Sequence, residues 1–419
     1  MERIRTIART VLPLLLLAAS TTRPAAQDLE RYLCEDVRLP FFSAAPQPDG
    51  AASCRPVRPN AITVPFRDPK PAGVFRLFVV GESAASILYG GPGGDAFERE
   101  GRALLHPGER LEHVNAGMGA YDSSRIVSVA REALEHSPDA LVVLSGHNEG
   151  RAILCGRAER LAARLREGLL RLRALVDDET ALRRARRLRR HEDSLRAMIR
   201  AARARRVPVV LCTLPLDARL PPSPEELESA AEPERASAST NALIARVARE
   251  EGACLADLHA AFAASPCAAA FADGVHWFPR CNPLAAHVVL SALAACPVGA
   301  GTALSAGPAA LAAARARALA DAASKTSARE ESGTVLLYAL SALQVQAHLG
   351  TPGALSERVL ALLSRAEALA PGPLREAARS EAGLRNAVRE SFFVHTLQSD
   401  SAAIYPLYLR HLEALRKRR

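Results

Sequence analysis

Short apolar runs alternate along the chain with longer segments in which apolar residues recur every three or four positions. Five runs have the length and content of buried strands: residues 75–80, 111–115, 140–145, 207–214 and 253–258. The helical patterns between them cover residues 95–105, 123–135, 157–206 in two or more pieces, and 241–251. Continuous apolar strands that alternate with helices are typical of a parallel sheet covered on both faces. The pattern therefore predicts an α/β domain whose active site lies beyond the carboxyl ends of the strands.

The segments that flank this pattern have a different character. Residues 28–72 are rich in proline, alanine and arginine, and we expect an irregular N-terminal segment there. Residues 221–236 resemble an exposed loop, and residues 298–419 show a helical period without strand signals. We therefore expect a catalytic domain over residues 73–297 and a small all-α region over residues 298–419.

Residues 1–27 have the features of an export signal. Arg3, Arg5 and Arg9 precede an apolar run over 11–19, which is too short to span a bilayer. We expect cleavage and a periplasmic or extracellular product, and the alternative is a retained signal that anchors the protein at the membrane. Beyond this segment no stretch of about 18 apolar residues occurs without charges, which argues against a polytopic membrane protein.

Composition excludes two further classes of protein. Of the 419 residues, 49% are hydrophobic and 24% charged, so a core can form and disorder is not the main state. The formal net charge is +9, which would suit a nucleic-acid partner. However, nearly all the basic residues are arginine in an alanine-rich chain, so we interpret the charge as compositional and expect no nucleic-acid binding.

Polar residues with chemical potential follow the predicted strands. Ser83 follows the first strand, a glycine-rich turn follows the second, Asn148 follows the third, and Asp273 and His276 come after the fifth. A serine hydroxyl becomes a nucleophile when an imidazole takes its proton and a carboxylate orients that imidazole. Amide groups from the Ser83 backbone, the Gly119–Ala120 turn and the Asn148 side chain are candidate donors to an oxyanion.

These motifs resemble the four sequence blocks of the SGNH/GDSL hydrolase family. The blocks are Gly81-Glu82-Ser83, the turn over residues 115–120, Gly146-x-Asn148-Glu149 and Asp273-x-x-His276. The resemblance covers roughly residues 75–296 and implies a flavodoxin-like three-layer α/β/α sandwich with a parallel sheet. Two departures stand out, because Glu82 replaces the usual aspartate and Ala120 stands where the family has a glycine.

The resemblance also implies an activity and a role for each residue. It assigns Ser83 as the nucleophile, His276 as the base and Asp273 as the group that orients it. Asn148 and the backbone amides of Ser83, Gly119 and Ala120 would form the oxyanion hole. The expected activity is that of a secreted or periplasmic serine esterase that hydrolyses a carboxylic ester through an acyl-enzyme.

Two other functions stay open at this point. One is an acyltransferase that modifies a cell-envelope polysaccharide, and the other is a catalytically silent SGNH-like binding domain. The expected substrate is a small-molecule, polysaccharide or lipid ester, and the helical C-terminal region is a possible binding site for a protein partner. We expect no cofactor and no metal, because the histidines lack metal-ligand spacing and the chain has no C-x-x-C pair.

The eight cysteines suggest disulfides in an exported protein. Cys267 precedes Asp273 by a few residues and Cys281 follows His276 by a few, so a bond between them would enclose both candidate residues of the site. The sequence does not determine the connectivity; we hypothesise this disulfide, and Cys34–Cys54 as a second, which would bridge the proline-rich N-terminal segment.

Overall fold

The computed structural model describes most of the predicted α/β domain. The described residues are 40–56, 64–89, 95–105, 109–119, 121–149, 179–217, 219–220, 233–296 and 307–324, with isolated positions at 161, 165, 331, 335, 364–365 and 368–369. The predicted signal segment over 1–27 lies outside this set, as do Ala120 and most of the predicted C-terminal region.

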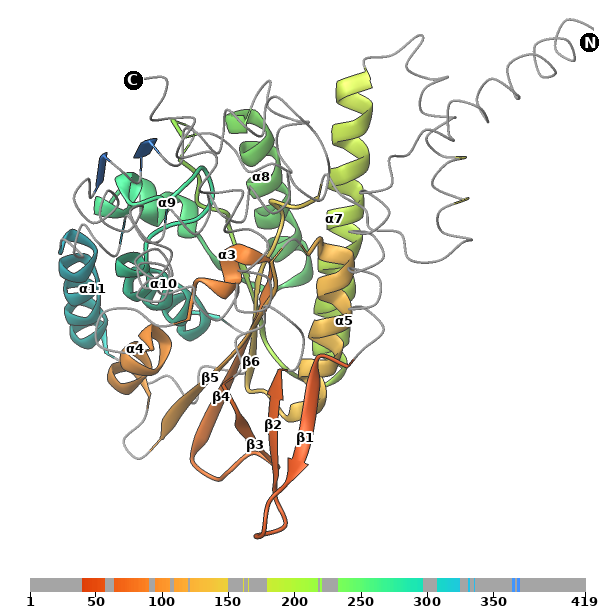
Figure 1. The fold of residues 1–419 in the computed structure, drawn as a ribbon, viewed down its shortest axis with the longest axis vertical. Coiled ribbons are helices and arrows are strands. Elements are labelled where there is room, and N and C mark those ends of the chain that lie inside the picture. Colours follow the sequence, from red (N-terminus) through yellow and green to blue (C-terminus); the bar gives the residue numbers. More distant parts are fainter. Residues whose placement is uncertain are drawn as a thin grey trace, which may run out of the picture.

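A five-stranded parallel sheet forms the centre of the molecule (Figure 1). Its strands are β4 (Val74–Gly81), β5 (Arg110–Gly117), β6 (Ala140–Leu144), β7 (Val209–Cys212) and β8 (Cys254–Ala256). All neighbouring strands pair in parallel, in the order β5-β4-β6-β7-β8. This is the flavodoxin-like order, in which the chain changes direction between its first and third parallel strands. The switch point therefore lies between the carboxyl ends of β4 and β6.

The five strand predictions are confirmed, within a few residues at each end. Every residue of β6 is buried, which explains why this strand is a continuous apolar run. Pairing joins Gly81 at the end of β4 to both Gly117 of β5 and Leu144 of β6. The residues that follow these strands therefore begin at one edge of the sheet.

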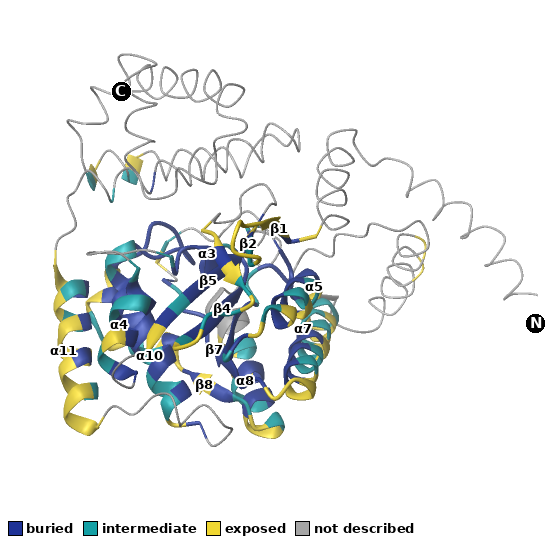
Figure 2. Ribbon diagram, turned by 90° about the horizontal axis from the view of Figure 1, so that it is seen from below, coloured by how far each residue is buried: buried dark blue, intermediate teal, exposed yellow. Residues whose placement is uncertain are grey.

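Helices cover both faces of the sheet (Figures 1 and 2). One layer contains α5 (Ser123–Ala133), α7 (Glu179–Ala204) and α8 (Pro233–Glu251), which pack in sequence against one another. The other contains α4 (Ala96–Leu104), α10 (Asn282–Ala294) and α11 (Pro308–Ala323), each of which packs against the other two. This arrangement confirms the predicted three-layer α/β/α sandwich. Shorter elements are α3 (Ser83–Ser86), α9 (Leu258–Ala263) and the 3-10 turns η1 (Leu134–His136), η3 (Pro266–Ala269) and η4 (Pro279–Cys281).

The N-terminal segment is more ordered than its sequence predicts. It contains an antiparallel sheet of β1 (Phe42–Pro46), β2 (Ala52–Pro56) and β3 (Phe66–Asp68). The expectation of an irregular segment over 28–72 is therefore wrong for these strands. Each strand is short, and β1 is exposed except at Phe42. The anchoring apolar side chains are mainly Phe42 and Phe66, which contact Phe78 of β4 edge to face.

The C-terminal prediction is supported where the structure describes it. Residues 308–323 form α11, and the isolated described positions beyond it are helical as well. The domain boundary near residue 297 and the extent of the helical region stay predictions. Within the described ranges, no helix has both the length and the apolar character needed to cross a membrane.

Two disulfides join described cysteines. Cys267 and Cys281 are bonded, which confirms the predicted bridge. A second bond, Cys254–Cys296, was not predicted and ties β8 to the end of α10. The predicted Cys34–Cys54 bond is wrong, because Cys54 is a free and buried thiol. Disulfides persist in oxidising compartments, so the two bonds are consistent with export.

Candidate active site

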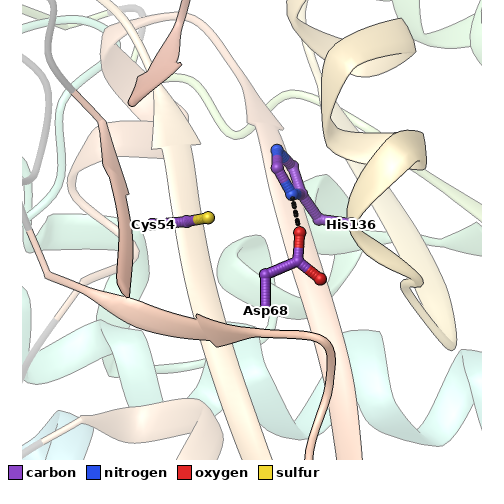
Figure 3. A group of neighbouring side chains, drawn as sticks. All are labelled: Cys54, Asp68 and His136. Carbon is purple, nitrogen blue, oxygen red and sulfur yellow. Dashed lines mark hydrogen bonds and ion pairs between the residues drawn. The ribbon is translucent and has the colours of Figure 1, made fainter. Parts of the chain in front are cut away.

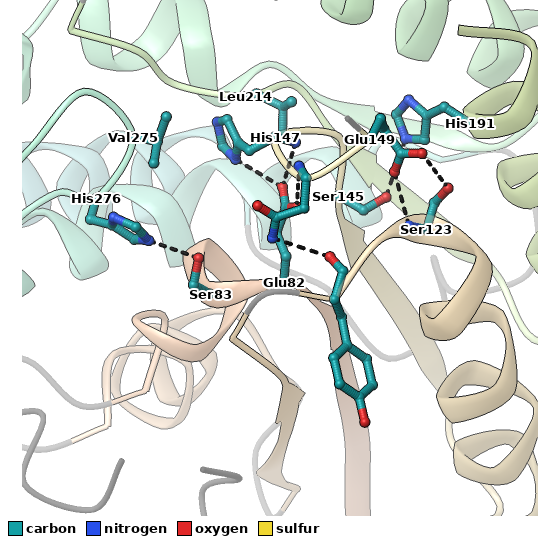
Figure 4. Close-up of polar contacts among 12 residues, drawn as sticks. Glu82, Ser83, Ser123, Ser145, His147, Glu149, His191, Leu214, Val275 and His276 are labelled. Atoms are coloured by element: carbon teal, nitrogen blue, oxygen red, sulfur yellow. Dashed lines mark hydrogen bonds and ion pairs between the residues drawn. The ribbon is translucent and has the colours of Figure 1, made fainter. Parts of the chain in front are cut away.

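Ser83, His276 and Asp273 form a continuous chain of hydrogen bonds at the carboxyl edge of the sheet. Figure 4 shows the contact between His276 and Ser83. The His276 Nε2 atom lies 2.7 Å from the Ser83 Oγ atom. The His276 Nδ1 atom lies 2.9 Å from each carboxylate oxygen of Asp273. Asp273 is fully buried and His276 is 7% exposed, whereas Ser83 is partly exposed. The serine therefore faces solvent while the carboxylate behind the imidazole is screened from water.

The chain places Ser83 at the first position of α3, directly after β4. A side chain at Gly81 would lie 2.1 Å from the Leu144 carbonyl oxygen, so only glycine allows β4 and β6 to approach this closely. The strand then turns sharply, and the amide of Ser83 belongs to the first turn of a helix, where N–H groups lack partners within the helix. This turn presents both the hydroxyl and the amide of Ser83 at the switch point.

The Asp273–His276 pair belongs to a short loop whose ends are bridged between Phe271 and Trp277. The Asp273 Oδ1 atom accepts hydrogen bonds from the backbone amides of Val275, at 3.0 Å, and His276, at 2.9 Å. These bonds fix the carboxylate within its own turn. Because Asp273 and His276 are three residues apart, a single turn can hold both side chains in contact.

Three further contacts tie this loop to the rest of the molecule. The Cys267–Cys281 disulfide closes the chain around it. The indole Nε1 of Trp277 donates to the Asn282 side chain at 2.9 Å, and Asn282 in turn donates to the carbonyl of Ile87, which follows α3. Arg365 donates to the Phe271 carbonyl and brings a cation near Asp273. The loop is therefore linked both to the segment that bears Ser83 and to the C-terminal part of the chain.

Asn148 lies in the loop after β6, on the other side of the switch point. Gly146 allows this loop to form, because its φ of +137° is unfavourable for other residues. The Asn148 side-chain amide donates to the Tyr121 carbonyl at 3.1 Å, and the residue is 5% exposed. The Tyr121 contact fixes the plane of the amide.

Glu82 links the segment before Ser83 to the loop that carries Asn148 (Figure 4). Its Oε1 atom accepts from the backbone N–H and the ring Nδ1 of His147, both at 2.8 Å. Its Oε2 atom accepts from the backbone N–H of Asn148 at 3.0 Å. The Glu82 side chain is fully buried, so these three bonds are what compensates its charge in the interior.

A second buried polar cluster supports the same loop from the side of α5 and α7 (Figure 4). The Glu149 carboxylate accepts from the backbone N–H of Ser123 at 2.9 Å and from its hydroxyl at 3.0 Å. Burial, followed by the nearby Asp122 carboxylate, raises the pKa of Glu149 to about 7. His191 on α7 contacts the Ser145 hydroxyl at 3.2 Å, and burial lowers its pKa to about 4.

The described part of the turn over residues 115–120 mainly holds the end of β5 against α3. The Asn115 amide donates to the Ala85 carbonyl at 2.9 Å, and its oxygen accepts from the Gly117 amide at 2.9 Å. Asn115 thereby joins the end of β5 to α3. Gly119 lies in open space, where a side chain would meet no atom within 4 Å. Ala120, the other predicted donor of this turn, lies outside the described residues.

The structure brings the predicted residues Ser83, Asp273 and His276 together, and it adds contacts around them that the sequence did not reveal. The roles of Glu82, Ser123 and His191 were not anticipated, since each appeared to be an ordinary polar residue. A signal was present for Glu82, because an acidic residue between a buried strand and a helix needs compensating donors. None of the residues of this site belongs to the group of potential metal ligands in the described part, Cys54, Asp68 and His136.

Comparisons with known proteins give a family for part of the chain. Residues 81–279, just under half of the chain, match the GDSL-like lipase/acylhydrolase family. No curated protein matches the chain. Among solved structures, a lipase/acylhydrolase from Enterococcus faecalis has 16% identity and a TM-score of 0.37, with 55% of this chain and 98% of that chain covered.

Two other solved structures show similar values. A GDSL-like lipase from Parabacteroides merdae has 17% identity and a TM-score of 0.36, with 52% of this chain and 94% of that chain covered. An acylhydrolase from Bacteroides fragilis has 14% identity and a TM-score of 0.35, with 64% and 96% covered. At these TM-scores the likenesses carry no argument about substrate, and the family match and the sheet order stand without them. Residues 81–279 therefore form a domain of the GDSL-like lipase/acylhydrolase family.

Proposed function

We propose that the protein is an exported serine esterase that hydrolyses carboxylic esters through an acyl-enzyme on Ser83. The observation that carries this proposal is the unbroken Asp273–His276–Ser83 chain, with contacts of 2.9 Å and 2.7 Å. A serine hydroxyl at this distance from an imidazole nitrogen can pass its proton to that nitrogen as it attacks a carbonyl carbon.

Acylation follows from the orientation of the imidazole. Asp273 accepts the Nδ1–H of His276, so Nε2 carries the lone pair that receives the Ser83 proton. The Ser83 oxygen then bonds to the ester carbon, and the carbonyl oxygen becomes an oxyanion. His276 passes the proton that it took from Ser83 to the oxygen of the leaving alcohol. The bond between that oxygen and the carbonyl carbon breaks, and the alcohol leaves.

Asn148 and backbone amides are our candidates for the donors to the oxyanion. A side-chain amide nitrogen has two N–H groups. The Tyr121 carbonyl accepts one from Asn148, so the other is available to a substrate. The Ser83 amide at the start of α3 is a second donor, and Gly119 with Ala120 would supply a third from the turn after β5. Donors fixed before the reaction lower the barrier because they need no reorganisation.

Deacylation uses the same residues in reverse. A water molecule gives a proton to His276 Nε2 and attacks the acyl carbon, and the proton then passes to Ser83 as the acid leaves. The partly exposed position of Ser83 supports access by water and by a small-molecule, polysaccharide or lipid ester. Export is supported by the features of residues 1–27 together with the two disulfides.

Hydrolysis of a short-chain nitrophenyl ester by the purified oxidised protein tests the proposal. We expect Ser83→Ala to lower kcat by several orders of magnitude, since loss of a catalytic serine costs about 10⁶-fold in a well-studied serine protease. Ser86→Ala is the matched control, because Ser86 is a serine of the same short helix and is not in the hydrogen-bond chain. Full activity of Ser83→Ala would refute the assignment of the nucleophile.

A fluorophosphonate probe separates an active site from a silent one. We expect one covalent adduct on Ser83 in the parent protein and none in Ser83→Ala. Release of free acid in the presence of added sugar alcohols supports hydrolysis, whereas formation of the sugar ester would reassign the protein as an acyltransferase.

A further inference from the structure

A cluster of three side chains lies apart from the catalytic residues, since two of its members precede β4 and β6 in the chain whereas Ser83 and Asn148 follow these strands. Cys54 belongs to β2, Asp68 ends β3, and His136 ends η1, just before β6 begins. Their ligand atoms, one sulfur, one carboxylate oxygen and one imidazole nitrogen, all lie within 4.8 Å of one another. Figure 3 shows the Cys54 sulfur pointing toward the His136 ring, with the Asp68 carboxylate beside both.

We propose that Cys54, Asp68 and His136 form a binding site for Zn²⁺. Thiolate, imidazole and carboxylate are the three donor types that zinc binds in proteins, whereas calcium and magnesium prefer oxygen alone. Three protein ligands leave a fourth tetrahedral position for water. The spacing along the chain gave no sign of the site, since Asp68 and His136 are 68 residues apart and Cys54 comes from another strand.

The surroundings hold the imidazole in place for this role. The His136 ring lies against three phenylalanine rings, with centroid distances of 5.1 Å to Phe42, 5.2 Å to Phe66 and 6.4 Å to Phe78. The His136 Nδ1 atom lies 2.7 Å from an Asp68 carboxylate oxygen. Zinc would replace this hydrogen bond, because both atoms would then point at the ion. Binding one ion would draw the three ligand atoms closer together than their present separations of up to 4.8 Å, and Asp68, whose side chain is 30% exposed, is the ligand least confined by burial.

The charges near the site balance a divalent cation. A thiolate and a carboxylate together carry two negative charges, and the thiol proton would pass to solvent when zinc binds. The guanidinium of Arg76 is the cation that interacts electrostatically with Cys54. Its Nε atom forms an ion pair with the Glu112 carboxylate at 2.5 Å. Its remaining guanidinium nitrogens donate to the carbonyls of His136 and Arg67. Arg76 therefore braces the backbone beside the ligands while Glu112 offsets its charge.

The partly exposed Asp68 and His136 give zinc a route from solvent, whereas Cys54 is only 1% exposed. An ion held here would join the small antiparallel sheet to the connection between α5 and β6. The Ser83 site lies after the carboxyl ends of the strands, so the two sites are separate. Its occupancy and the esterase activity are separate measurements.

Titration of the metal-free, oxidised full-length protein with Zn²⁺ against a competing indicator tests this proposal. We expect one zinc ion per chain and a melting temperature that rises by about 5 °C at saturation. Cys54→Ser and Asp68→Asn should each weaken binding by more than about 100-fold, the upper range for loss of an outer-sphere contact. Co²⁺ should give a sulfur-to-metal charge-transfer band that Cys54→Ser lacks.

Matched controls separate this site from other thiols and other histidine–carboxylate pairs. Cys212→Ser removes the other free buried cysteine among the described residues, and Asp95→Asn breaks the His113–Asp95 pair, at 2.8 Å, which includes no cysteine. Both should bind zinc like the parent. Absence of binding in the parent, or unchanged binding in Cys54→Ser, would overturn the proposal. If Cys54→Ser does not fold, Asp68→Asn, altered at a partly exposed position, decides the question.

Discussion

The carboxylate of Glu82 lies 3.0 Å from the backbone nitrogen of Asn148, so the residue before Ser83 holds the loop that carries the candidate oxyanion donor. The two residues follow different strands of the sheet and meet across its switch point. The same carboxylate accepts two bonds from His147 through its other oxygen. The glutamate that replaces the usual aspartate therefore fixes the loop of His147 and Asn148 in this chain.

Glu82→Gln should lower kcat on the order of tenfold, with little change in KM. A glutamine has one acceptor oxygen and one NH2 group, whereas the donors from His147 and Asn148 approach both oxygens of Glu82. One donor would therefore face another donor, and the Asn148 loop would shift. This loss is smaller than the full loss of an oxyanion donor.

Steady-state hydrolysis of the nitrophenyl ester measures the effect of Glu82→Gln, beside a thermal melt. Glu100→Gln is the control, because Glu100 is also a buried glutamate but lies on α4. Equal kcat values in the two variants would show that Glu82 does not position the site.

Asn148→Ala should lower kcat by about 10²- to 10³-fold, which is typical when one oxyanion donor is removed. Substrate binding in the ground state should change little. Asn241→Ala is the matched control, since the Asn241 amide both accepts from and donates to the Leu214 backbone, at 2.7 Å and 3.1 Å. Asn241→Ala should lower the melting temperature but leave kcat close to that of the parent. A fully active Asn148→Ala variant would remove this residue from the oxyanion hole.

The two disulfides should differ in their effect on activity. Loss of Cys267–Cys281, with a sequence separation of 14, should cost about 3 kcal/mol of unfolding free energy, and loss of Cys254–Cys296, with a separation of 42, about 4 kcal/mol. Both bonds enclose Asp273 and His276 along the chain, but the first closes the much shorter segment, whose ends lie within a few residues of the two side chains. Below the melting temperature of both double-alanine variants, the first should show a lower kcat and the second should not.

Ester hydrolysis and urea unfolding of the two variants at the same temperature check the disulfide prediction. Equal kcat values in both variants, with the expected losses of stability, would mean that the bridge stabilises the fold without orienting the site.

Glu149 and His191 should impose opposite pH dependences on stability. Burial raises the pKa of Glu149 from 4.5 to about 7, so its contribution to stability is complete below pH 4.5 and is lost as pH rises through 7. Burial lowers the pKa of His191 from 6.5 to about 4, so its contribution is complete above pH 6.5 and is lost as pH falls through 4. Each effect is about 3 kcal/mol at full extent.

Urea unfolding of single variants between pH 4 and pH 8 separates these two effects. The free energy of unfolding of Glu149→Gln, relative to the parent, should increase as pH rises from 4.5 to 7. That of His191→Gln should increase as pH falls from 6.5 to 4. Differences from the parent that stay constant across the range would contradict the assigned pKa values.

Much of this fold follows from local sequence patterns. The run at 140–145 is short, apolar and flanked by turns, which favours a buried strand, and the structure contains β6 there. The positions of Ser83, Asn148 and His276 followed from the rule that polar residues after parallel strands meet at one edge. The sequence thus predicted which residues lie at the edge of the sheet.

Contacts between distant segments could not be predicted in the same way. The strands β1 to β3 carry few apolar residues, and their stability comes from packing on Phe78 and from Glu132, which accepts the backbone amides of Phe41 and Phe42 at 2.8 Å and 2.7 Å. The Cys254–Cys296 bond likewise depends on how β8 lies beside α10. Such pairings depend on which segments lie close together in space, and the local pattern of apolar residues does not contain that information.

The Cys267–Cys281 bond lies inside the segment closed by Cys254–Cys296. Four cysteines can pair in three ways, and only one of them gives this nested arrangement. The choice of expression host therefore matters for this protein. Material made in a reducing cytoplasm will lack both bonds, and refolding it in air can produce mispaired isomers, whose number the other four cysteines of the chain increase. Preparations intended for assays of substrate preference should be made through an oxidising secretory route and checked for both linkages before any ester is tested.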